Sequence, residues 1–210
     1  MEKSEFSRNV ILCNGQFPSH HIPLSILLAA HTRICCDGAA NVLYKKKLQP
    51  RVVIGDLDSI EPEIKDAFAD ILVHNSDENT NDQTKAIQWA VSQGIKDVVI
   101  LGATGKREDH TLGNISLLVA YAKMLSVCMV TDYGIFTPIS STTVFQSFVG
   151  QQVSIFSLSQ NKEISSEQLK YPLSHKTLQS WWEGTLNESL AQSFRIVCNN
   201  AEVLVFQKFT

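Results

Sequence analysis

Short apolar runs that end in Gly, Asn or Asp alternate with longer amphipathic stretches over residues 9–132. Apolar runs of this length are typical of strands in a parallel sheet whose two faces are both covered. The alternation predicts a doubly wound, mostly parallel α/β sheet domain, in which ligands bind beyond the carboxyl ends of the strands. The apolar runs cover residues 10–14 and begin again at Arg33, Val52, Ile71, Val98 and Val127, and helical spacing occupies 39–46, 62–68, 82–93 and 111–123.

The pattern changes after Tyr133, where β-branched and aromatic residues mix with Ser, Thr and Gln. Alternation typical of antiparallel strands covers residues 143–149, 153–158, 194–198 and 203–209. We therefore expect the α/β domain to cover residues 1–135 and a small all-β, sandwich-like domain to follow it over residues 136–210.

Composition excludes several classes of function. The 210 residues are 44 % hydrophobic and 19 % charged, which is typical of a globular protein. A net charge of −3 gives no basic field, so we expect no nucleic-acid partner. Five Cys without CxxC spacing predict neither a disulfide framework nor a zinc site. No apolar run approaches the roughly 20 residues that span a bilayer, so we expect a soluble, cytoplasmic protein with no membrane partner.

Two pairs of reactive side chains have ordinary explanations. Cys35 and Cys36 lie in a predicted buried strand, where packing is a better explanation than nucleophilic chemistry. His20 and His21 precede a Pro in a predicted loop without further ligands nearby, so we expect no metal there.

Carboxylates concentrate in the first part of the chain, because nine of the ten Asp residues lie between Asp37 and Asp109. Asp56 and Asp58 follow a predicted strand and stand two residues apart, so both carboxylates can face the same side. Mg²⁺ prefers oxygen ligands and typically takes one or two carboxylates together with substrate phosphates. The alternative is a turn in which both side chains accept bonds from local backbone amides.

Three more segments end predicted strands or open predicted helices. In GATGKREDH, the glycines leave backbone amides free to bind phosphate, and Arg107 and Lys106 add positive charge. The alternative is that the glycines form plain turns and that Asp109 caps the following helix. Asp82 and Lys85 lie one helical turn apart on the same side of a predicted helix. Asp82 could be a metal ligand and Lys85 a phosphate contact; the alternative is a helix cap with a surface ion pair. Asp37 with Gly38 suits a ribose or phosphate contact as much as a helix cap.

Taken in order, these segments resemble the thiamine pyrophosphokinase (thiamine diphosphokinase) family. The matching stretches are DGAAN from Asp37, GDLDS from Gly55, TNDQTK ending at Lys85, GATGKREDH from Gly102 to His110, LKYPL from Leu169, and GTLNE from Gly184.

The resemblance implies a catalytic, nucleotide-binding α/β domain joined to a thiamine-binding β-sandwich, working as a homodimer. It implies transfer of the pyrophosphoryl group of ATP to the hydroxyl of thiamine, with Mg²⁺ as cofactor, giving thiamine diphosphate and AMP. By position, it implies Mg²⁺ ligands at Asp56, Asp58 and Asp82. The resemblance implies that five residues take part in catalysis: Asp56, Asp58, Asp82, Arg107 and Asp109. ATP contacts are implied at Asp37, Gly38, Lys85, Gly102, Thr104, Gly105, Lys106, Arg107 and His110.

The thiamine contacts depart from the family pattern. Leu186 stands where the family has Ser, which puts the acceptor contact in question; Asn187, Glu188 and Trp181 are the remaining candidates. Trp181 suits a cationic thiazolium or, alternatively, the core of a small β domain. Two alternative functions stay open: a phosphotransferase or pyrophosphotransferase acting on another hydroxyl, and a non-catalytic thiamine or nucleotide sensor.

Overall fold

The structure is a computed structural model, and it describes residues 8–159 and 161–210. The chain divides into two compact units. The first comprises Met1–Ile115 with Lys123–Asp132, and the second comprises Ser116–Ala122 with Tyr133–Thr210. Each unit is described by itself.

The first unit contains a six-stranded parallel sheet in the order β6-β5-β1-β2-β3-β4. Val10, Ile11 and Ile34 are fully buried, as expected for strands covered on both faces. Cys35 and Cys36 are also buried, so their predicted packing role is confirmed. The strands are β1 (Asn9–Leu12), β2 (Thr32–Cys36), β3 (Val52–Gly55), β4 (Leu72–His74), β5 (Asp97–Leu101) and β6 (Ser126–Val130).

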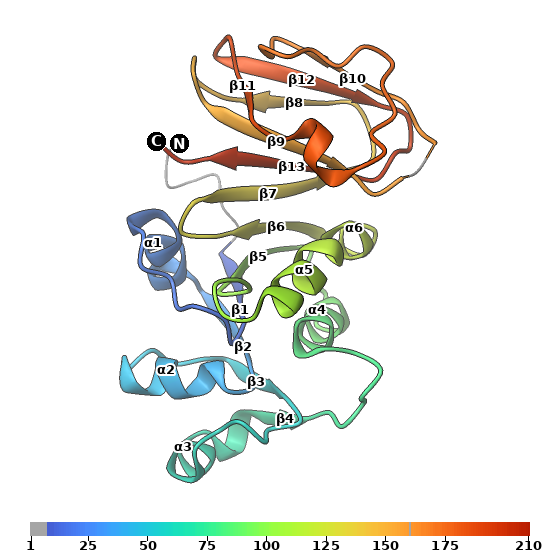
Figure 1. Ribbon diagram of the computed structural model, residues 1–210. Helices are drawn as coiled ribbons and strands as arrows, with labels where there is room; N and C mark the ends of the chain where they lie inside the picture. The colour runs from blue at the N-terminus through green and yellow to red at the C-terminus, as the bar shows by residue number, and fades with distance from the viewer. Residues whose placement is uncertain (1–7, 160) are drawn as a thin grey trace. The chain divides into compact units, whose positions relative to one another are not determined.

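Helices flank this sheet, with α1 and α2 on one side of it in Figure 1 and α4 and α5 on the other. The direction of strand addition reverses once along the chain. Strands β1 to β4 are added one after another toward one edge of the sheet, and the chain then returns through α4 to add β5 on the other side of β1. The sheet is therefore doubly wound, as predicted. The helices are α1 (His21–Ala29), α2 (Ala39–Lys45), α3 (Pro62–Ala67), α4 (Asp82–Ser92) and α5 (Glu108–Ser116), and a 3-10 turn, η1 (Ala69–Ile71), precedes β4.

Two local predictions in this unit were wrong. His21 begins α1 and does not lie in a loop, and the side chain of His20 caps the helix by accepting a bond from the Ile22 N–H. Apolar residues occupy nearly every position of α1, so no polar face marked the helical period. The predicted buried strand at Ile71 is only the three-residue β4, at the end of the strand order, with Val73 37 % exposed.

Helix α4 begins as its sequence predicts. Asn81 caps it, with Oδ1 accepting from the Thr84 N–H at 2.9 Å. The helical spacing predicts one apolar face for Ala86, Ile87, Ala90 and Val91; the first three are fully buried, whereas Val91 is 37 % exposed. The helix packs on β1, β2 and β3. This packing fixes the position of Asp82 relative to the ends of those strands.

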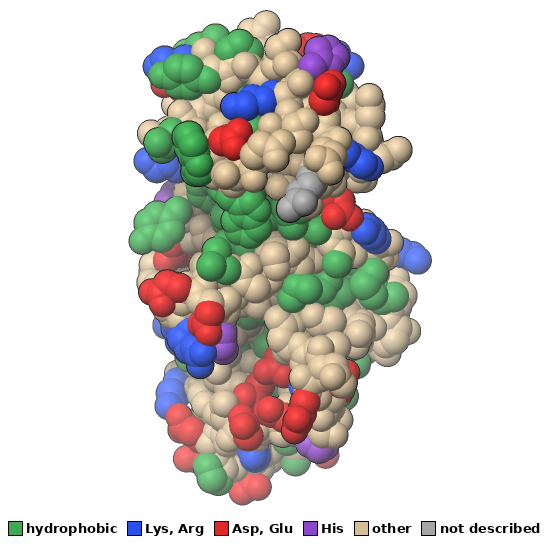
Figure 2. Space-filling view, turned by 45° about the vertical axis from the view of Figure 1, so that its right-hand side comes forward, with side chains coloured by type: hydrophobic (Ala, Val, Ile, Leu, Met, Phe, Trp, Pro, Cys, Tyr) green, Lys and Arg blue, Asp and Glu red, His purple; other side chains and the backbone are tan. Residues whose placement is uncertain are grey.

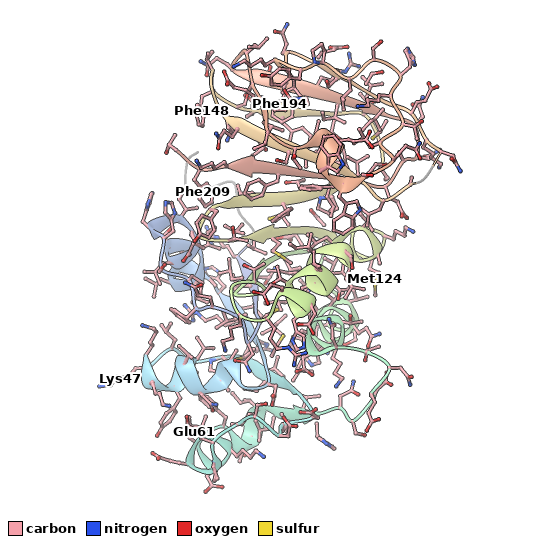
Figure 3. All side chains as sticks on the ribbon, viewed as in Figure 1. Lys47, Glu61, Met124, Phe148, Phe194 and Phe209 are labelled. Atoms are coloured by element: carbon pink, nitrogen blue, oxygen red, sulfur yellow. The ribbon has the colours of Figure 1, made fainter. Side chains whose placement is uncertain are left out.

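The second unit is built from two antiparallel sheets, in the orders β11-β9-β13-β7 and β10-β12-β8. Its core includes Phe145 and Phe194, which stack with ring centroids 5.1 Å apart; Figure 3 labels Phe194 on β12. The strands are β7 (Gly134–Ile139), β8 (Thr143–Gln146), β9 (Gln152–Ser157), β10 (Ile164–Glu167), β11 (Asn187–Glu188), β12 (Ser193–Cys198) and β13 (Val203–Lys208).

Two short helical segments belong to this unit. Helix α6 (Leu118–Tyr121) packs against β7 and β13, and both of its terminal residues are buried. The 3-10 turn η2 (Trp181–Gly184) packs against β9. The predicted class, an α/β sheet followed by a small all-β part, is confirmed. None of the helices in the described residues is both long and apolar enough to cross a bilayer.

Candidate active site

A cavity of about 890 Å³, lined mainly by polar and charged residues, opens at the carboxyl ends of the strands of the first unit. It is lined by residues that follow β1, β2, β3, β4 and β5, by the first turn of α4 and by the first two turns of α5. The chain leaves β1 and β5 in opposite directions along the sheet, which makes this the switch point where doubly wound sheets bind ligands. Predicted site residues that line the cavity are Asp37, Asp56, Asp58, Asp82, Lys85, Thr104, Lys106, Arg107, Asp109 and His110.

Three carboxylates meet at one side of this cavity. One oxygen from each of Asp37, Asp56 and Asp58 lies within 4.8 Å of the others. Leu57 adopts a left-handed φ of 65°, and this turn brings the two flanking Asp residues together. The Asp58 N–H donates to Asp56 Oδ1 at 3.2 Å, and Ser59 Oγ donates to Asp58 Oδ1 at 2.9 Å. Figure 2 shows a group of acidic side chains in the lower half of the view.

Asp37 is the buried member of the three, at 4 % exposure. Within the described part of the chain, its Oδ1 atom is buried and has no hydrogen-bond partner. Burial raises the pKa of Asp37 and the carboxylates of Asp56 and Asp58 raise it further, against hydrogen bonds from Ser59 and Gly38 that lower it. An orphaned oxygen beside two more carboxylates is a donor set that fits Mg²⁺.

Asp82 lies nearby but is engaged with a cation. Its Oδ1 is 3.3 Å from Nζ of Lys85, and only 5 % of the Lys85 side chain is exposed. Burial raises the pKa of Asp82, and this effect exceeds the lowering effect of Lys85. A Cβ built on Gly55 would lie 2.8 Å from Asp37 Cβ and 3.2 Å from Asp82 Oδ1, so the bare glycine leaves room for both. Asp82 is thus paired with Lys85 through Oδ1 and lies outside the three-carboxylate group.

Three glycines that were predicted to contact ATP, Gly38, Gly102 and Gly105, are not among the residues that line the cavity. Gly102 and Gly105 have φ of 65° and 86°, and a Cβ on either would lie within 2.8 Å of the 13–16 loop. Gly38 is equally tight, since its Cβ would lie 2.5 Å from Nδ2 of Asn14. These residues allow close packing of the loops that carry the polar groups.

The loop after β1 was missed in the sequence. The Gly15 N–H donates to Gly102 O at 2.6 Å, and the Gln16 N–H donates to Thr104 O at 2.8 Å. Asn14 Oδ1 accepts from Lys106 Nζ at 3.2 Å, which holds this cation at the cavity. The available signal was Asn-Gly at the end of the first apolar run, the same strand-end position as the acidic segments.

Arg107 and Asp109 form a two-point ion pair on the exposed side of the cavity. Nε of Arg107 lies 3.1 Å from Asp109 Oδ1, and Nη2 lies 2.6 Å from Oδ2. The guanidinium lowers the pKa of Asp109 to about 2, while the carboxylate raises the pKa of Arg107. Asp109 therefore stays ionised at neutral pH and is a weak proton acceptor.

Asn114 is a second residue that sequence reasoning did not single out. Its Nδ2 donates to Ala103 O at 2.8 Å, and its Oδ1 accepts from Asn81 Nδ2 at 3.1 Å. Nε2 of the buried Gln83 donates to the Asn114 carbonyl at 3.1 Å. The side chain thus connects the loop after β5 to the start of α4, which carries Asp82.

The three thiamine candidates lie in the second unit. Asn187 is buried, and its side chain accepts from the N–H groups of Tyr171 and Glu188 and donates to Tyr171 O at 2.7 Å. Glu188 pairs with Lys170 at 3.1 Å. Trp181 is 41 % exposed and packs edge-on against Phe156. Asn187 therefore braces the 169–173 segment, and thiamine contacts at these three residues stay predictions.

Comparison with known families and proteins gives a consistent result. The family model for the catalytic domain of thiamin pyrophosphokinase matches residues 24–129, and the model for the substrate-binding domain of thiamin pyrophosphokinase matches residues 134–206. Thiamine pyrophosphokinase 1 of Oryza sativa subsp. japonica is 30 % identical over 51 % of this chain and 50 % of its own. Thiamin pyrophosphokinase 1 of Caenorhabditis elegans is 31 % identical over 49 % and 46 %. The matches span about half the length of these curated relatives.

Two crystal structures share the fold at low sequence identity. Thiamine pyrophosphokinase from Bacillus subtilis has a TM-score of 0.78 at 20 % identity, covering 95 % of this chain and 98 % of its own. A thiamin pyrophosphokinase family protein from Enterococcus faecalis has a TM-score of 0.81 at 17 % identity, covering 97 % and 100 %. At these identities the likeness shows the fold alone.

Proposed function

Because the chain belongs to the thiamin pyrophosphokinase family, we propose that it transfers the pyrophosphoryl group of ATP to the hydroxyl of thiamine. The products are thiamine diphosphate and AMP. The observation that carries this proposal is that carboxylates and cations line the same cavity. The three-carboxylate group comprises Asp37, Asp56 and Asp58, and the cations are Lys85, Lys106 and Arg107. Pyrophosphoryl transfer from ATP requires carboxylates that bind a divalent cation and cationic side chains that bind the phosphates.

The phosphates of ATP are expected on the basic side of the cavity. Arg107 offers a planar guanidinium that can bind a phosphate at two points, whereas Lys106 and Lys85 act as point charges. Thr104 and His110 line the same cavity. Asp37 and Gly38 remain our candidates for the nucleotide end, and the tight glycines Gly102 and Gly105 shape the loop that faces the phosphates.

The acidic side would hold Mg²⁺ through Asp56 and Asp58, with Asp82 as the third predicted ligand. When bound, the ion would neutralise phosphate charge and polarise phosphoryl oxygens. The contribution of the chain itself is to hold these carboxylates in place, through the turn at Leu57 and the hydrogen bond from Ser59 to Asp58.

The reaction depends on positioning and charge stabilisation more than on covalent chemistry by the protein. The thiamine hydroxyl attacks the β-phosphorus in line with the departing AMP oxygen, so the bond to that oxygen breaks as the new one forms. Arg107 stabilises charge on the transferred group once phosphate displaces Asp109 from one of its two contacts. Asp109, with a pKa of about 2, is a poor acceptor for the hydroxyl proton. That proton passes to Asp82, whose pKa is raised by burial, or to solvent.

The remaining expectations extend the same proposal. We assign residues 1–135 to the catalytic nucleotide-binding part and residues 136–210 to the thiamine-binding part. Trp181 would stack on the cationic ring of thiamine, and Glu188 and Asn187 would offer polar contacts. A homodimer and a cytoplasmic location complete the expected description.

One observation favours a second candidate, a phosphotransferase or pyrophosphotransferase acting on another hydroxyl. Leu186 is 83 % exposed and has a left-handed φ of 58°. It cannot donate the hydrogen bond that a Ser at this position could donate to a thiamine acceptor atom. A different acceptor with an apolar face would fit this side chain better.

A product assay decides between these activities. The purified chain is incubated with thiamine, ATP and Mg²⁺, and products are followed by ³¹P NMR and chromatography. We expect thiamine diphosphate and AMP in equal amounts. Formation of ADP, or turnover only with another hydroxylated heterocycle, supports the second candidate. Binding of thiamine and ATP without any product identifies a sensor and refutes both transfer activities.

A further inference from the structure

We infer that Asn114 and Gln83 are positioning residues for the transfer reaction. Their side chains hold the first turn of α4 at a fixed distance from the 102–107 loop that follows β5. The inference rests on the proposed function in one respect, because pyrophosphoryl transfer is the reaction that needs this spacing. Neither side chain has to touch a substrate to take this role.

Two separate segments bring charged side chains to the cavity. The first turn of α4 carries Asp82 and Lys85, whereas the loop after β5 carries Lys106 and Arg107. The strand before α4 is β4, and three strands, β1, β2 and β3, lie between β4 and β5 in the sheet. Hydrogen bonding within the sheet therefore does not by itself set the spacing between the two segments.

Asn114 lies in the last turn of α5 and bonds to both segments at once. Its Nδ2 donates to Ala103 O at 2.8 Å, and its Oδ1 accepts from Asn81 Nδ2 at 3.1 Å. Asn81 is the cap of α4, because its own Oδ1 accepts from the Thr84 N–H at 2.9 Å. The amide group of Asn114 thus connects the loop after β5 directly to the residue at which α4 begins.

The carbonyl that Asn114 bonds is the middle one of three that are held in succession. The carbonyl oxygens of Gly102 and Thr104 accept backbone N–H groups of the 13–16 loop at 2.6 and 2.8 Å. Between them, Ala103 O accepts from Asn114. Loss of the Asn114 side chain would therefore disconnect the start of α4 from this loop, while the bonds from the 13–16 loop remain.

Gln83 supplies a second connection on the buried side of α4. It is 3 % exposed, and its Nε2 donates to Asn114 O at 3.1 Å. Its Oε1 accepts from Cys13 Sγ, which follows β1, at 3.5 Å. A buried amide needs partners at both of its ends, so this arrangement is specific in geometry. Because Gln83 directly follows Asp82, these bonds attach the turn that carries Asp82 to α5 and to the end of β1.

The spacing between the two segments matters because the transfer is an in-line displacement. A displacement of about 1 Å, even from a change far from the reacting atoms, can lower the rate about 100-fold. The cations Lys106 and Arg107 remain on their loop when the connection is lost, so ATP still has its phosphate contacts. What changes is the position of Asp82 and Lys85 relative to those phosphates. Loosening the connection should therefore lower kcat more than it lowers the affinity for ATP.

The test compares the unaltered chain with Asn114→Ala and Gln83→Met, the second of which keeps the length of the side chain. Steady-state kinetics with thiamine, ATP and Mg²⁺ give kcat and KM, and calorimetry gives Kd for ATP. We expect kcat to fall about tenfold or more in Asn114→Ala and about threefold or more in Gln83→Met, with KM and Kd for ATP changed less than about threefold.

Asn9→Ala is the matched control. Asn9 begins β1, and its Nδ2 donates to Asp97 O at 3.1 Å, at the opposite end of β1 and β5 from the cavity. This variant removes a comparable bond from a side-chain amide to a backbone carbonyl. It should lower the melting temperature about as much as Asn114→Ala does and leave kcat within about twofold of the unaltered value. All assays are run well below the melting temperature of each variant.

Hydrogen–deuterium exchange of the chain without ligands tests the connection independently of turnover. Asn114→Ala should speed the exchange of backbone amides in residues 81–85, because the cap of α4 loses its contact with α5. Exchange in β3 should stay unchanged in this variant. Asn9→Ala should alter neither segment.

Two results would overturn the inference: an unchanged kcat in both cavity variants, or an equal loss of kcat in Asn9→Ala, which would assign the effect to general stability. Failure of the proposed function is distinguishable from both. If the unaltered chain forms no thiamine diphosphate, the proposed function fails and the exchange comparison decides the inference. Faster exchange of residues 81–85 in Asn114→Ala alone then supports it, and unchanged exchange refutes it.

Discussion

Nζ of Lys85 lies 3.3 Å from Oδ1 of Asp82, and the two residues occupy the first turn of α4. The lysine is 5 % exposed and the aspartate side chain 32 %, so the pair is shielded from solvent mainly on the lysine side. Such a pair contributes little net stability when intact but is costly to break from one side.

Lys85→Met should therefore destabilise the chain, because it leaves the Asp82 carboxylate without its cation. We expect a loss of about 1–3 kcal/mol in the free energy of unfolding, reduced from the fully buried case by the exposure of Asp82. Chemical denaturation measures it. The double variant Lys85→Met with Asp82→Asn should recover part of the loss, and additive effects of the two changes would contradict the pairing.

Gly55→Ala should impair the site more than the fold. The added Cβ would lie 2.8 Å from Asp37 Cβ and 3.2 Å from Asp82 Oδ1, so these carboxylates must move. We expect a stability cost of about 1–3 kcal/mol for overpacking and a loss of most turnover. For comparison, Gly113→Ala adds a Cβ within α5 that meets nothing within 4 Å and should not destabilise the chain. Normal turnover in Gly55→Ala would contradict the geometry.

Asp132 gives a pH-dependent prediction. It accepts bonds from the N–H groups of Ser19 and His20 at 3.0 Å and from the Ser19 hydroxyl, which fastens the chain before α1 to the end of β6. Burial alone would raise the pKa of Asp132, but these hydrogen bonds outweigh it and lower the pKa. Asp132→Asn should cost about 1–2 kcal/mol at pH 7.

The same lowered pKa sets the pH range of the effect. Because the folded value lies below the unfolded one of about 3.9, the carboxylate stabilises the fold above that pH and loses its contribution as the pH falls further. Thermal melts at pH 7 and pH 3 measure it. The difference between the unaltered chain and Asp132→Asn should shrink at pH 3, and a constant difference would contradict the assignment.

Asn187→Ala should destabilise the second unit. The variant leaves the N–H and C=O groups of Tyr171 without the partners that Asn187 supplies. Loss of these bonds in a buried position should cost about 1–3 kcal/mol. The control is Glu188→Gln, which removes only the exposed pair with Lys170 and should cost less than about 1 kcal/mol. Equal effects of the two changes would contradict the bracing role.

Leu186→Ser tests the acceptor. If thiamine is the acceptor, the new hydroxyl can supply one hydrogen bond, and KM for thiamine should fall by about 2–10-fold with kcat little changed. Steady-state kinetics of both chains give the comparison. An unchanged KM would count against a thiamine contact at this position.

Most of the first unit could be predicted because its strands are continuous apolar runs and its helices are amphipathic. α1 could not, because apolar residues at nearly every position hide the 3.6-residue period. In the second unit, β7, the four-residue β10 and the two-residue β11 escaped prediction, since short or Pro-containing strands give a weak alternating signal.

The residues that make up the candidate site could be predicted from the sequence, but the ion pairs and hydrogen bonds between them could not. Strand-end positions brought Asp56, Asp58 and Asp37 to one cavity, as the parallel topology implies. That Asp82 would be held by Lys85, leaving Asp37 to complete the group, depends on side-chain conformations and burial that spacing does not encode. The bracing role of Asn114 likewise depends on which carbonyl lies within its reach.

Helix α6 interrupts the first unit in sequence while packing with the second. The chain accordingly passes between the units three times, after Ile115, after Ala122 and after Asp132. A single cleavage of the chain therefore cannot produce two fragments that each contain one whole unit. A fragment that ends at Asp132 would carry Leu118 and Tyr121 without β7 and β13 to cover them, and a fragment that starts at Tyr133 would lack those side chains. Separate expression or exchange of either half between relatives should therefore produce poorly soluble products.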